Sequence, residues 1–404
     1  MSSYAAVLRT PHAARAFGAA LVGRLSYGTV SLSLVLAVKD ASGSFSVAGT
    51  AMALFGVASV LLSPARAALV DRYGPRRALV PMAGLYAVLL AVLALVTREP
   101  GTPGPLLWVL AALSGACTPP LGPTMRALWS QLLPDRSMVQ RAYSLDGVAE
   151  ELLLVSGPLL VGVLVAYAEP AAGVALSAVL VLAGTLGLVF SPVPFAAGTR
   201  AVRAKRAGAR PGPRGLGQPV LAAAGVGLCL GALDLLAIAF TEDHHQPGAV
   251  AWVLAVLSAG SAVGGLVNGA VTWRLPARPR LALLCAALGL ALAAAGLAPN
   301  VYALGAAVAV AGLFVAPALT TAYLIADEAA APGTRTQAGA WVNTAVNAGI
   351  SGGTAAVGVL VGRLPLALCF ALAALPALLC VATALRTGPP NRPAVVAGRQ
   401  GTLG

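Results

Sequence analysis

The chain has 404 residues, of which 58% are hydrophobic and only 10% are charged. Because soluble domains carry about 25% charged residues, this composition excludes an ordinary soluble domain and predicts a polytopic membrane protein. The net charge of +13 does not indicate nucleic-acid binding, since the arginines lie in short connections between apolar segments, where the positive-inside rule places them.

In chain order, twelve apolar segments are each long enough for a membrane-spanning helix, which needs about 20 residues. The segment from 1 to 14 has no apolar core, so we expect the first span to be retained and not cleaved as a signal peptide. The predicted fold is an all-α integral membrane protein with spans at 16–38, 46–66, 78–96, 105–128, 144–168, 171–191, 218–240, 249–272, 281–298, 301–325, 338–362 and 365–385.

A basic polar segment between the sixth and seventh spans divides the chain into two halves of six spans each. Two short sequence echoes support a repeat: 67–71 resembles 264–268, and Gly157-Pro158 with Gly162 resembles Gly353-Thr354 with Gly358. Transporters are commonly built from such repeats. We therefore predict two pseudo-symmetric six-helix bundles, with an N-terminal half at 1–192, a linker at 193–217, a C-terminal half at 218–386 and a tail at 387–404.

The distribution of basic residues predicts the orientation. With the N-terminus inside, Lys39, Arg98 and Arg363 are outside and Arg24 lies within a span, which leaves 22 of the 26 basic residues inside. Basic short loops remain in the cytoplasm. We expect both termini and the linker to be cytoplasmic, in a multi-pass protein of the plasma membrane.

The turn between the second and third spans carries the most distinctive sequence, Ala67-Ala-Leu-Val-Asp-Arg-Tyr-Gly-Pro-Arg-Arg77. It resembles the signature of the major facilitator superfamily between these two helices, although Ala67 replaces its first glycine and Pro75 precedes the arginine pair. The resemblance implies a loop that couples the conformations of the two halves. Its carboxylate can pair with the arginines or meet the N-terminus of a neighbouring helix. The residues of this loop are Asp71, Arg72, Gly74, Arg76 and Arg77.

The fifth span contains Gly157-Pro158-Leu-Leu-Val-Gly162, which resembles a Gly-Pro-x-x-Gly-Gly pattern found in many antiporters of that superfamily. The resemblance implies a drug/proton-antiporter-like member, and the Ala-, Gly- and Arg-rich composition favours a bacterial one. A proline kinks a helix and glycines let helices approach closely, so packing alone also accounts for the pattern. The fourth span is expected to break at Pro119, Pro120 and Pro123.

Ionisable residues within spans are costly and are therefore functional candidates. Arg24 lies in the first span, where it either faces a polar cavity or extends to the cytoplasmic headgroups. Ser26, Thr29 and Ser33 share one helix face, which we expect to line a polar cavity. In the eleventh span Asn343, Asn347 and Ser351 form a second polar stripe, which binds substrate or hydrogen-bonds between helices.

Three acids, Asp234, Glu150 and Glu151, are the candidates for proton coupling. Asp146 and Glu150 share a face of the fifth span, followed by Glu151, and each either titrates as a pair or pairs with basic residues such as Arg126, Arg141 or Arg24. Asp234 stands alone in the seventh span, where it must be protonated, paired across helices or open to water. We rank Asp234 ahead of Glu150 and Glu151 as the proton carrier, because apolar neighbours favour its neutral form.

The remaining reactive residues indicate neither a cofactor nor a metal. The five cysteines lie within apolar spans, and the sequence Glu242-Asp-His-His245 has no further ligand at a fixed spacing. No phosphate loop, zinc signature or nucleophile elbow occurs, so neither an enzyme nor an ATP-driven pump is expected. A non-transporting sensor or an intramembrane enzyme is a weaker alternative.

These residues predict a monomeric secondary transporter whose partners are the lipid bilayer, a small-molecule substrate and protons. Proton-coupled export of a small amphipathic molecule is the leading prediction, and proton-coupled uptake of a metabolite is the alternative. The sequence names no substrate.

Overall fold

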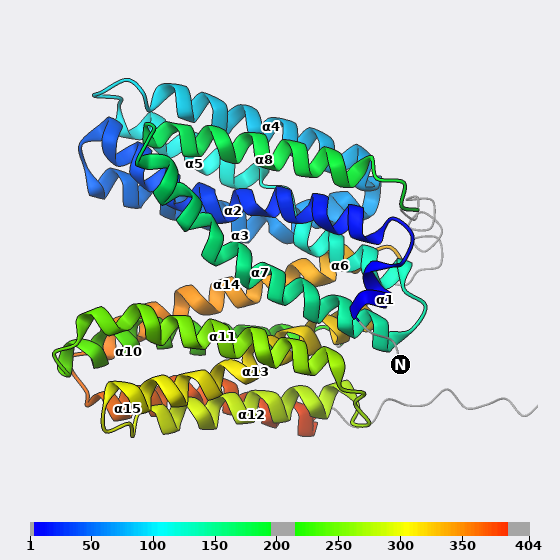
Figure 1. Cartoon of the computed structure of the whole chain (residues 1–404), viewed down its shortest axis with the longest axis vertical. Helices are drawn as coiled ribbons and strands as arrows, with labels where there is room; N and C mark the ends of the chain where they lie inside the picture. The colour runs from blue at the N-terminus through cyan, green and yellow to red at the C-terminus, as the bar shows by residue number, and fades with distance from the viewer. Residues whose placement is uncertain (1–3, 195–214, 387–404) are drawn as a thin grey trace, which may run out of the picture.

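The computed structural model describes residues 4–194 and 215–386, and this part of the chain is almost entirely helical (Figure 1). A short helix, α1 (Tyr4–Leu8), precedes the first long one. The N-terminal half contains α2 (Ala13–Ser42), α3 (Phe45–Tyr73), α4 (Pro75–Val96), α5 (Gly104–Cys117), α6 (Leu121–Leu132), α7 (Arg136–Val165) and α8 (Pro170–Val189). The C-terminal half contains α10 (Gly217–Asp243), the 3-10 turn η1 (Pro247–Ala249), α11 (Val250–Ala270), α12 (Ala277–Ala295), α13 (Val301–Ala329), α14 (Arg335–Leu360) and α15 (Leu366–Arg386).

The twelve predicted spans correspond to these helices, with α5 and α6 forming the fourth span in two pieces. In the described residues, ten helices are long and apolar enough to cross a membrane, and α14 and α15, packed along α10 and α12, complete the twelve. Most ends agree within a few residues, but the predicted start of the fifth span at 144 is wrong, because α7 begins at Arg136. Its polar first two turns are helical because they pack inside the protein, where Arg141 and Tyr143 are buried.

Local sequence explains the tight turns between helices. Gly43 adopts a left-handed conformation (φ +67°) after α2, and the Ser44 side chain accepts a hydrogen bond from Val47 N at the start of α3. At the opposite end of α3, Gly74 has φ +82° and Pro75 is the first residue of α4, where its missing N–H costs nothing. Gly43 with Ser44, and Gly74 with Pro75, thus each reverse the direction of the chain within two residues.

The same pairs of helices pack together in both halves. In the N-terminal half the first span, α2, contacts the fifth and sixth, α7 and α8. In the C-terminal half the first span, α10, likewise contacts the fifth and sixth, α14 and α15. Glycines permit the closest approaches: a Cβ on Gly157 would lie 2.4 Å from the backbone of Gly28, and a Cβ on Gly349 would lie 2.4 Å from Ala224 O. Two related six-helix bundles therefore form the molecule, as the internal echoes predicted.

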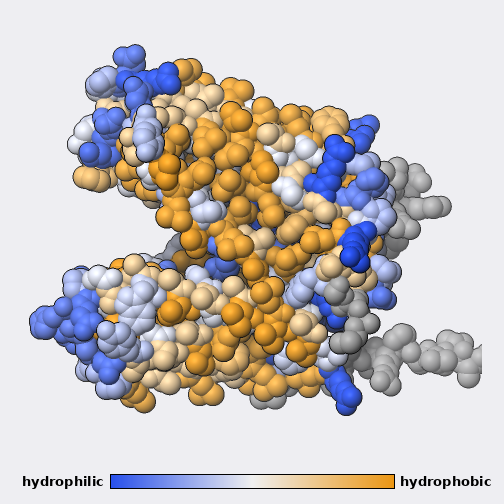
Figure 2. Space-filling model, viewed as in Figure 1, coloured by the Kyte–Doolittle hydropathy of each residue, from blue (hydrophilic) through white to orange (hydrophobic). Residues whose placement is uncertain are grey.

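The two halves touch at one end and separate at the other. We call the end where α8 finishes and α10 begins the linker end, and the opposite end the open end. The contacts between halves are chiefly α3 with α14 and α7 with α11. Figure 2 shows a deep cleft between the halves that widens towards the open end, while the outer faces carry a broad band of apolar side chains suited to lipid.

Candidate functional site

A buried cluster of four charged residues lies at the base of the cleft. Arg24 of α2 and Arg126 of α6 both bind Asp146 of α7, at 2.6 Å to Oδ1 and 2.9 Å to Oδ2 respectively. Both guanidinium groups also bind Glu150 Oε2, one turn further along α7, at 3.0 and 2.5 Å. Two positive and two negative charges balance, which burial at this depth requires.

Exposure within the charge cluster is uneven. The side chains of Arg24, Arg126 and Asp146 are 2%, 5% and 0% exposed, whereas that of Glu150 is 39% exposed. Glu150 lies between the halves and not on the outer surface, because its partner Arg126 stacks on Tyr323 of the opposite half. The free edge of Glu150 is thus the part of the cluster that faces the cleft.

Tyr323 connects the cluster to the C-terminal half. Its ring centre lies 4.0 Å from the Arg126 guanidinium carbon, a cation–π contact, and its hydroxyl is 3.4 Å from Asn343 Oδ1 on α14. On the other side of the halves' interface, the Ser261 hydroxyl of α11 donates to Glu151 Oε1 at 3.0 Å. The sequence analysis missed Tyr323, since an aromatic residue in an apolar span carries no distinguishing signal.

Two expectations for the first span have different outcomes. Arg24 points into the protein and pairs with acids, so it does not extend to the headgroups. The expectation that Ser26, Thr29 and Ser33 line a cavity is wrong in this conformation, because all three are fully buried. Thr29 Oγ1 lies 2.7 Å from Ser177 Oγ of α8, and the small side chains on this face let α2 and α8 pack closely.

The helix break between α5 and α6 is held by an arginine. Pro119 and Pro120 lack the N–H groups that would bind the carbonyls of Gly115 and Ala116 four residues earlier. Arg66 of α3 donates to both of these carbonyls, at 2.6 and 2.8 Å. Pro123 lies in the first turn of α6, where no N–H is needed. Arg66 was not predicted as a site residue, although the two prolines identify the carbonyls that need a donor.

The polar stripe of α14 is half exposed and bonds mainly along its own helix. Asn347 Nδ2 donates to Asn343 O at 2.8 Å, and the Ser351 hydroxyl donates to Asn347 O at 3.2 Å. Thr344, on an adjacent face of α14, donates to Val60 O of α3 at 3.1 Å. The stripe therefore lies beside the contact between the halves, with side-chain groups left open to the cleft.

At the linker end, Asp71 caps a helix of the other half. Its Oδ1 accepts from Thr336 N at 3.2 Å and its Oδ2 from Gln337 N at 2.8 Å, so the carboxylate sits on the N-terminus of α14. Of the two partners considered for this acid, the helix N-terminus is the one it binds. The neighbouring arginines serve elsewhere: Arg72 stacks on Tyr73, and Arg76 donates to Val189 O at 3.3 Å.

The second half repeats this arrangement with an amide in place of the carboxylate. Asn268, at the end of α11, corresponds to Asp71, and its amide donates to Ser144 Oγ of α7 at 3.3 Å. Gln140 of α7 donates to Asn268 O at 2.5 Å and accepts from Arg280 Nη1 at 3.0 Å. Asp71 in the first half and Asn268 in the second half thus both bind a helix of the other half at the linker end.

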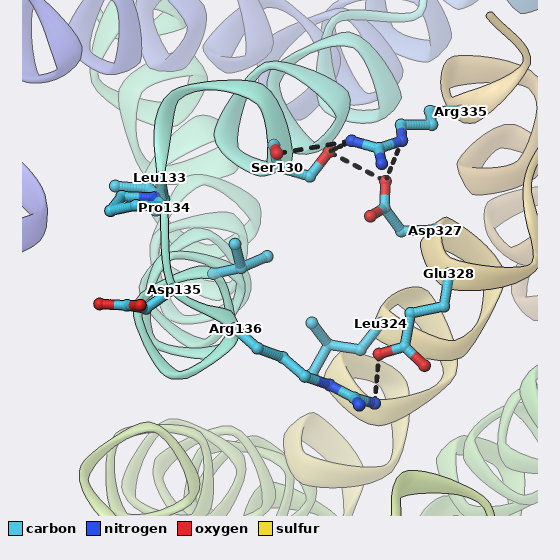
Figure 3. A pocket seen from close by; sticks show the side chains of 10 residues that line it. Ser130, Leu133, Pro134, Asp135, Arg136, Leu324, Asp327, Glu328 and Arg335 are labelled. Carbon is cyan, nitrogen blue, oxygen red and sulfur yellow. Dashed lines mark hydrogen bonds and ion pairs between the residues drawn. The ribbon is translucent and has the colours of Figure 1, made fainter. Parts of the chain in front are cut away.

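Further ion pairs surround a cavity of about 290 Å³ at the linker end (Figure 3). Arg136 of α7 binds Glu328 of α13, and Arg335 of α14 lies 3.6 Å from Asp327 Oδ1. Ser130 of α6 accepts from Arg335 at 3.0 Å and donates to Asp327 at 3.0 Å. The Arg136–Glu328 pair and the two Ser130 hydrogen bonds join the halves, whereas the Arg335–Asp327 pair lies within the C-terminal half.

Asp234 lies apart from the charge cluster, on α10 of the C-terminal half. It is exposed, and it makes no ion pair within the described parts of the chain. The loop acids and histidines Glu242–His245 are at the open end, where His244 stacks on Phe240. Among residues 4–194 and 215–386, no group of three or more His, Cys, Asp or Glu side chains is placed to hold a metal ion.

Comparison with known proteins agrees with this geometry. Residues 16–239 and 219–403 match the Major Facilitator Superfamily, while no curated protein sequence matches significantly. The fold is similar to that of a bacterial homologue of the iron transporter ferroportin in its outward-facing state with soaked iron (TM-score 0.69, 15% identity, 92% of this chain and 97% of that chain). It is also similar to the human organic anion transporter MFSD10 (TM-score 0.70, 13% identity, 93% and 99%). With both halves matched and the fold shared, the chain belongs to the Major Facilitator Superfamily.

Proposed function

We propose that this secondary transporter exports a small amphipathic molecule in exchange for protons. The observation that carries the proposal is a charge-balanced cluster at the base of a cleft that is open at one end and closed at the other. Such a cleft exposes a central site to one side of the membrane at a time, as alternating access requires. Ionisable groups at this depth are retained at a cost, which favours a role in coupling.

In this proposal the linker end faces the cytoplasm and the open end faces the outside of the cell. The basic bias of the sequence supports a cytoplasmic linker and cytoplasmic termini, which makes the present conformation outward-facing. In that state Asp71, the Arg136–Glu328 ion pair and the hydrogen bond from Arg335 to Ser130 hold the cytoplasmic end closed. The helix break at Pro119–Pro120 and the close contact of Gly157 with Gly28 are the places where we expect helices of the N-terminal half to bend or slide.

Among the acids, Asp234 is the first candidate for the proton carrier. Glu150 is held by two guanidinium groups, which favour its ionised form, and Glu151 accepts a hydrogen bond from Ser261. Asp234 has neither kind of partner in the described residues, so its carboxylate gains and loses a proton without breaking an ion pair. Glu151 and then Glu150 follow as candidates.

Transport into proteoliposomes tests the proposal. Vesicles that are acidic inside should accumulate substrates from a panel of amphipathic molecules, because an antiporter releases protons as it takes substrate up. Accumulation only when the outside is acidic would instead show symport and support metabolite uptake. Transport that ignores the pH gradient would contradict proton coupling.

The orientation has a separate test. A cysteine introduced at Gly208, which lies outside the described residues, should resist an impermeant thiol reagent on intact cells in a background without native cysteines. Strong labelling would reverse the assignment of sides and, with it, the outward-facing assignment.

A further inference from the structure

Asp234 is an uncompensated charge in the membrane interior. The four charges of the cluster neutralise one another, and the two Nη atoms of Arg66 donate to carbonyl oxygens. No basic side chain in residues 4–194 and 215–386 lies within ion-pair distance of Asp234, although a carboxylate in a span is costly when it has no partner. Because no residue of the described chain pairs with Asp234, its exposed carboxylate is free for water, a proton or a bound cation.

The position of Asp234 on α10 directs it to the cleft. Gly231, one turn earlier, touches Ile350 O of α14, and Cys229 contacts Ala373 O of α15. Ala237, three residues later, is fully buried. Asp234 and Ile238 form an exposed stripe on α10, between the side that packs on α14 and the buried side that contains Ala237. Because α14 itself packs on α3 of the other half, this side of α10 faces the space between the halves.

The helices packed around α10 supply no counter-charge at this depth. Arg280 of α12, Arg335 of α14, and Asp327 and Glu328 of α13 all lie at the linker end, and α11 has no charged residue. At the open end lie Arg363, after α14, and Glu242, Asp243 and His244, at the end of α10 itself. Asp234 precedes the end of α10 by nine residues, which corresponds to about 14 Å.

The opposite wall of the cleft has the same polarity. Arg24 and Arg126 are almost fully covered, whereas the Glu150 carboxylate reaches the surface of the cleft. Both walls thus present carboxylate oxygens and withhold guanidinium groups. Near Asp234, the exposed side chain of Ile238 offers apolar contact to the rest of a ligand. A small organic cation with an apolar body fits these surfaces better than an anion.

We propose that Asp234 binds the cationic group of the transported substrate, and that substrate and proton compete for this carboxylate. The inference rests on the proposed export function and adds the charge class of the substrate. In the outward-facing state a proton from outside neutralises Asp234 and the cation leaves to the open end. On the cytoplasmic side a new cation displaces that proton, so one proton enters for each singly charged cation exported.

Binding of two ions of the same shape and opposite charge tests the proposal. Purified full-length protein should bind tetraphenylphosphonium and should bind tetraphenylborate at least tenfold more weakly. Each phosphonium bound should release up to one proton, measured with a pH dye in weak buffer. Apparent affinity should fall towards tenfold per pH unit once the solution is acidic enough to protonate Asp234.

Variants of the acid separate binding from folding. Asp234→Asn should bind phosphonium at least tenfold more weakly and release no proton, while Asp234→Glu should retain both properties. Asp243→Asn, which removes an acid at the open end of the same helix, serves as the matched control and should behave as wild type. Failure of wild type to bind the cation, equal binding of the borate, or unchanged binding by Asp234→Asn would overturn the cation site. Proton-driven transport of other molecules would then still stand, whereas cation binding without proton-driven transport would contradict only the export function.

Discussion

Replacement of Asp71 by asparagine should shift the protein away from its linker-closed conformation. The carboxylate accepts two hydrogen bonds from the N-terminus of α14, and these bonds exist only while the linker end is closed. Asparagine removes the charge and one acceptor. Because one hydrogen bond contributes about 0.5–1.5 kcal/mol and a negative charge at a helix N-terminus about 0.3–1 kcal/mol, a loss of roughly 1–2 kcal/mol is expected, which changes an equilibrium about 5–30-fold.

The reactivity of a buried thiol measures this shift. Ala338 is 2% exposed and lies just after the two residues of α14 that bind Asp71, so a cysteine there reacts only when the linker end opens. In a background without the five native cysteines, Asp71→Asn should speed labelling of Ala338→Cys by roughly 5–30-fold. Transport should slow, and substrate affinity should stay within about twofold, because Asp71 is remote from the cleft.

Asp40→Asn provides the matched control, since Asp40 is an exposed acid at the open end of α2. It should leave the labelling rate unchanged. An unchanged rate in Asp71→Asn, or a large loss of substrate binding with the fold intact, would refute the role of the cap.

Three further changes test other parts of the structure. Arg66→Leu removes the hydrogen bonds to Gly115 O and Ala116 O at the helix break, which should cost roughly 2 kcal/mol and lower the midpoint of thermal unfolding; an unchanged midpoint would show that these bonds do not stabilise the break. Gly157→Val should push α7 away from Gly28 of α2 and reduce transport with normal expression, and wild-type transport would argue against close packing at this site. Charge reversal at Arg136 or Glu328 alone should speed labelling of Ala338→Cys, and the double reversal should restore the slow rate; additive effects would mean that this pair does not hold the linker end closed.

The positions of the spans could be predicted from the sequence, because a helix that crosses a bilayer needs a long apolar segment and the cytoplasmic turns between such segments are basic. The break of the fourth span followed from Pro119 and Pro120, whose missing N–H groups are a local property. The shared face of Asp146 and Glu150 also followed from helical spacing. These features depend on residues that are close in sequence.

Helical spacing defines a face and not what the face meets, so pairing with Arg24 or Arg126 was only one of two alternatives for the acids of α7. Ser26, Thr29 and Ser33 do share a face, but all three are buried, and Thr29 meets Ser177 of α8. The pairing of Arg24 and Arg126 with the same two acids joins three helices, and the stacking of Tyr323 on Arg126 joins the two halves. Arrangements of this kind arise only from tertiary packing.

Distances across both ends of the cleft test alternating access most directly. Spin labels at Ser46 and His245 would report the open end, and labels at Tyr73 and Ala331 the linker end, in protein without native cysteines. We predict that pulsed dipolar spectroscopy finds a long open-end and a short linker-end distance in the resting state. Substrate or a change of pH should shorten the first and lengthen the second together. Distances that stay fixed, or that change at one end only, would contradict transport by rocking of the two halves.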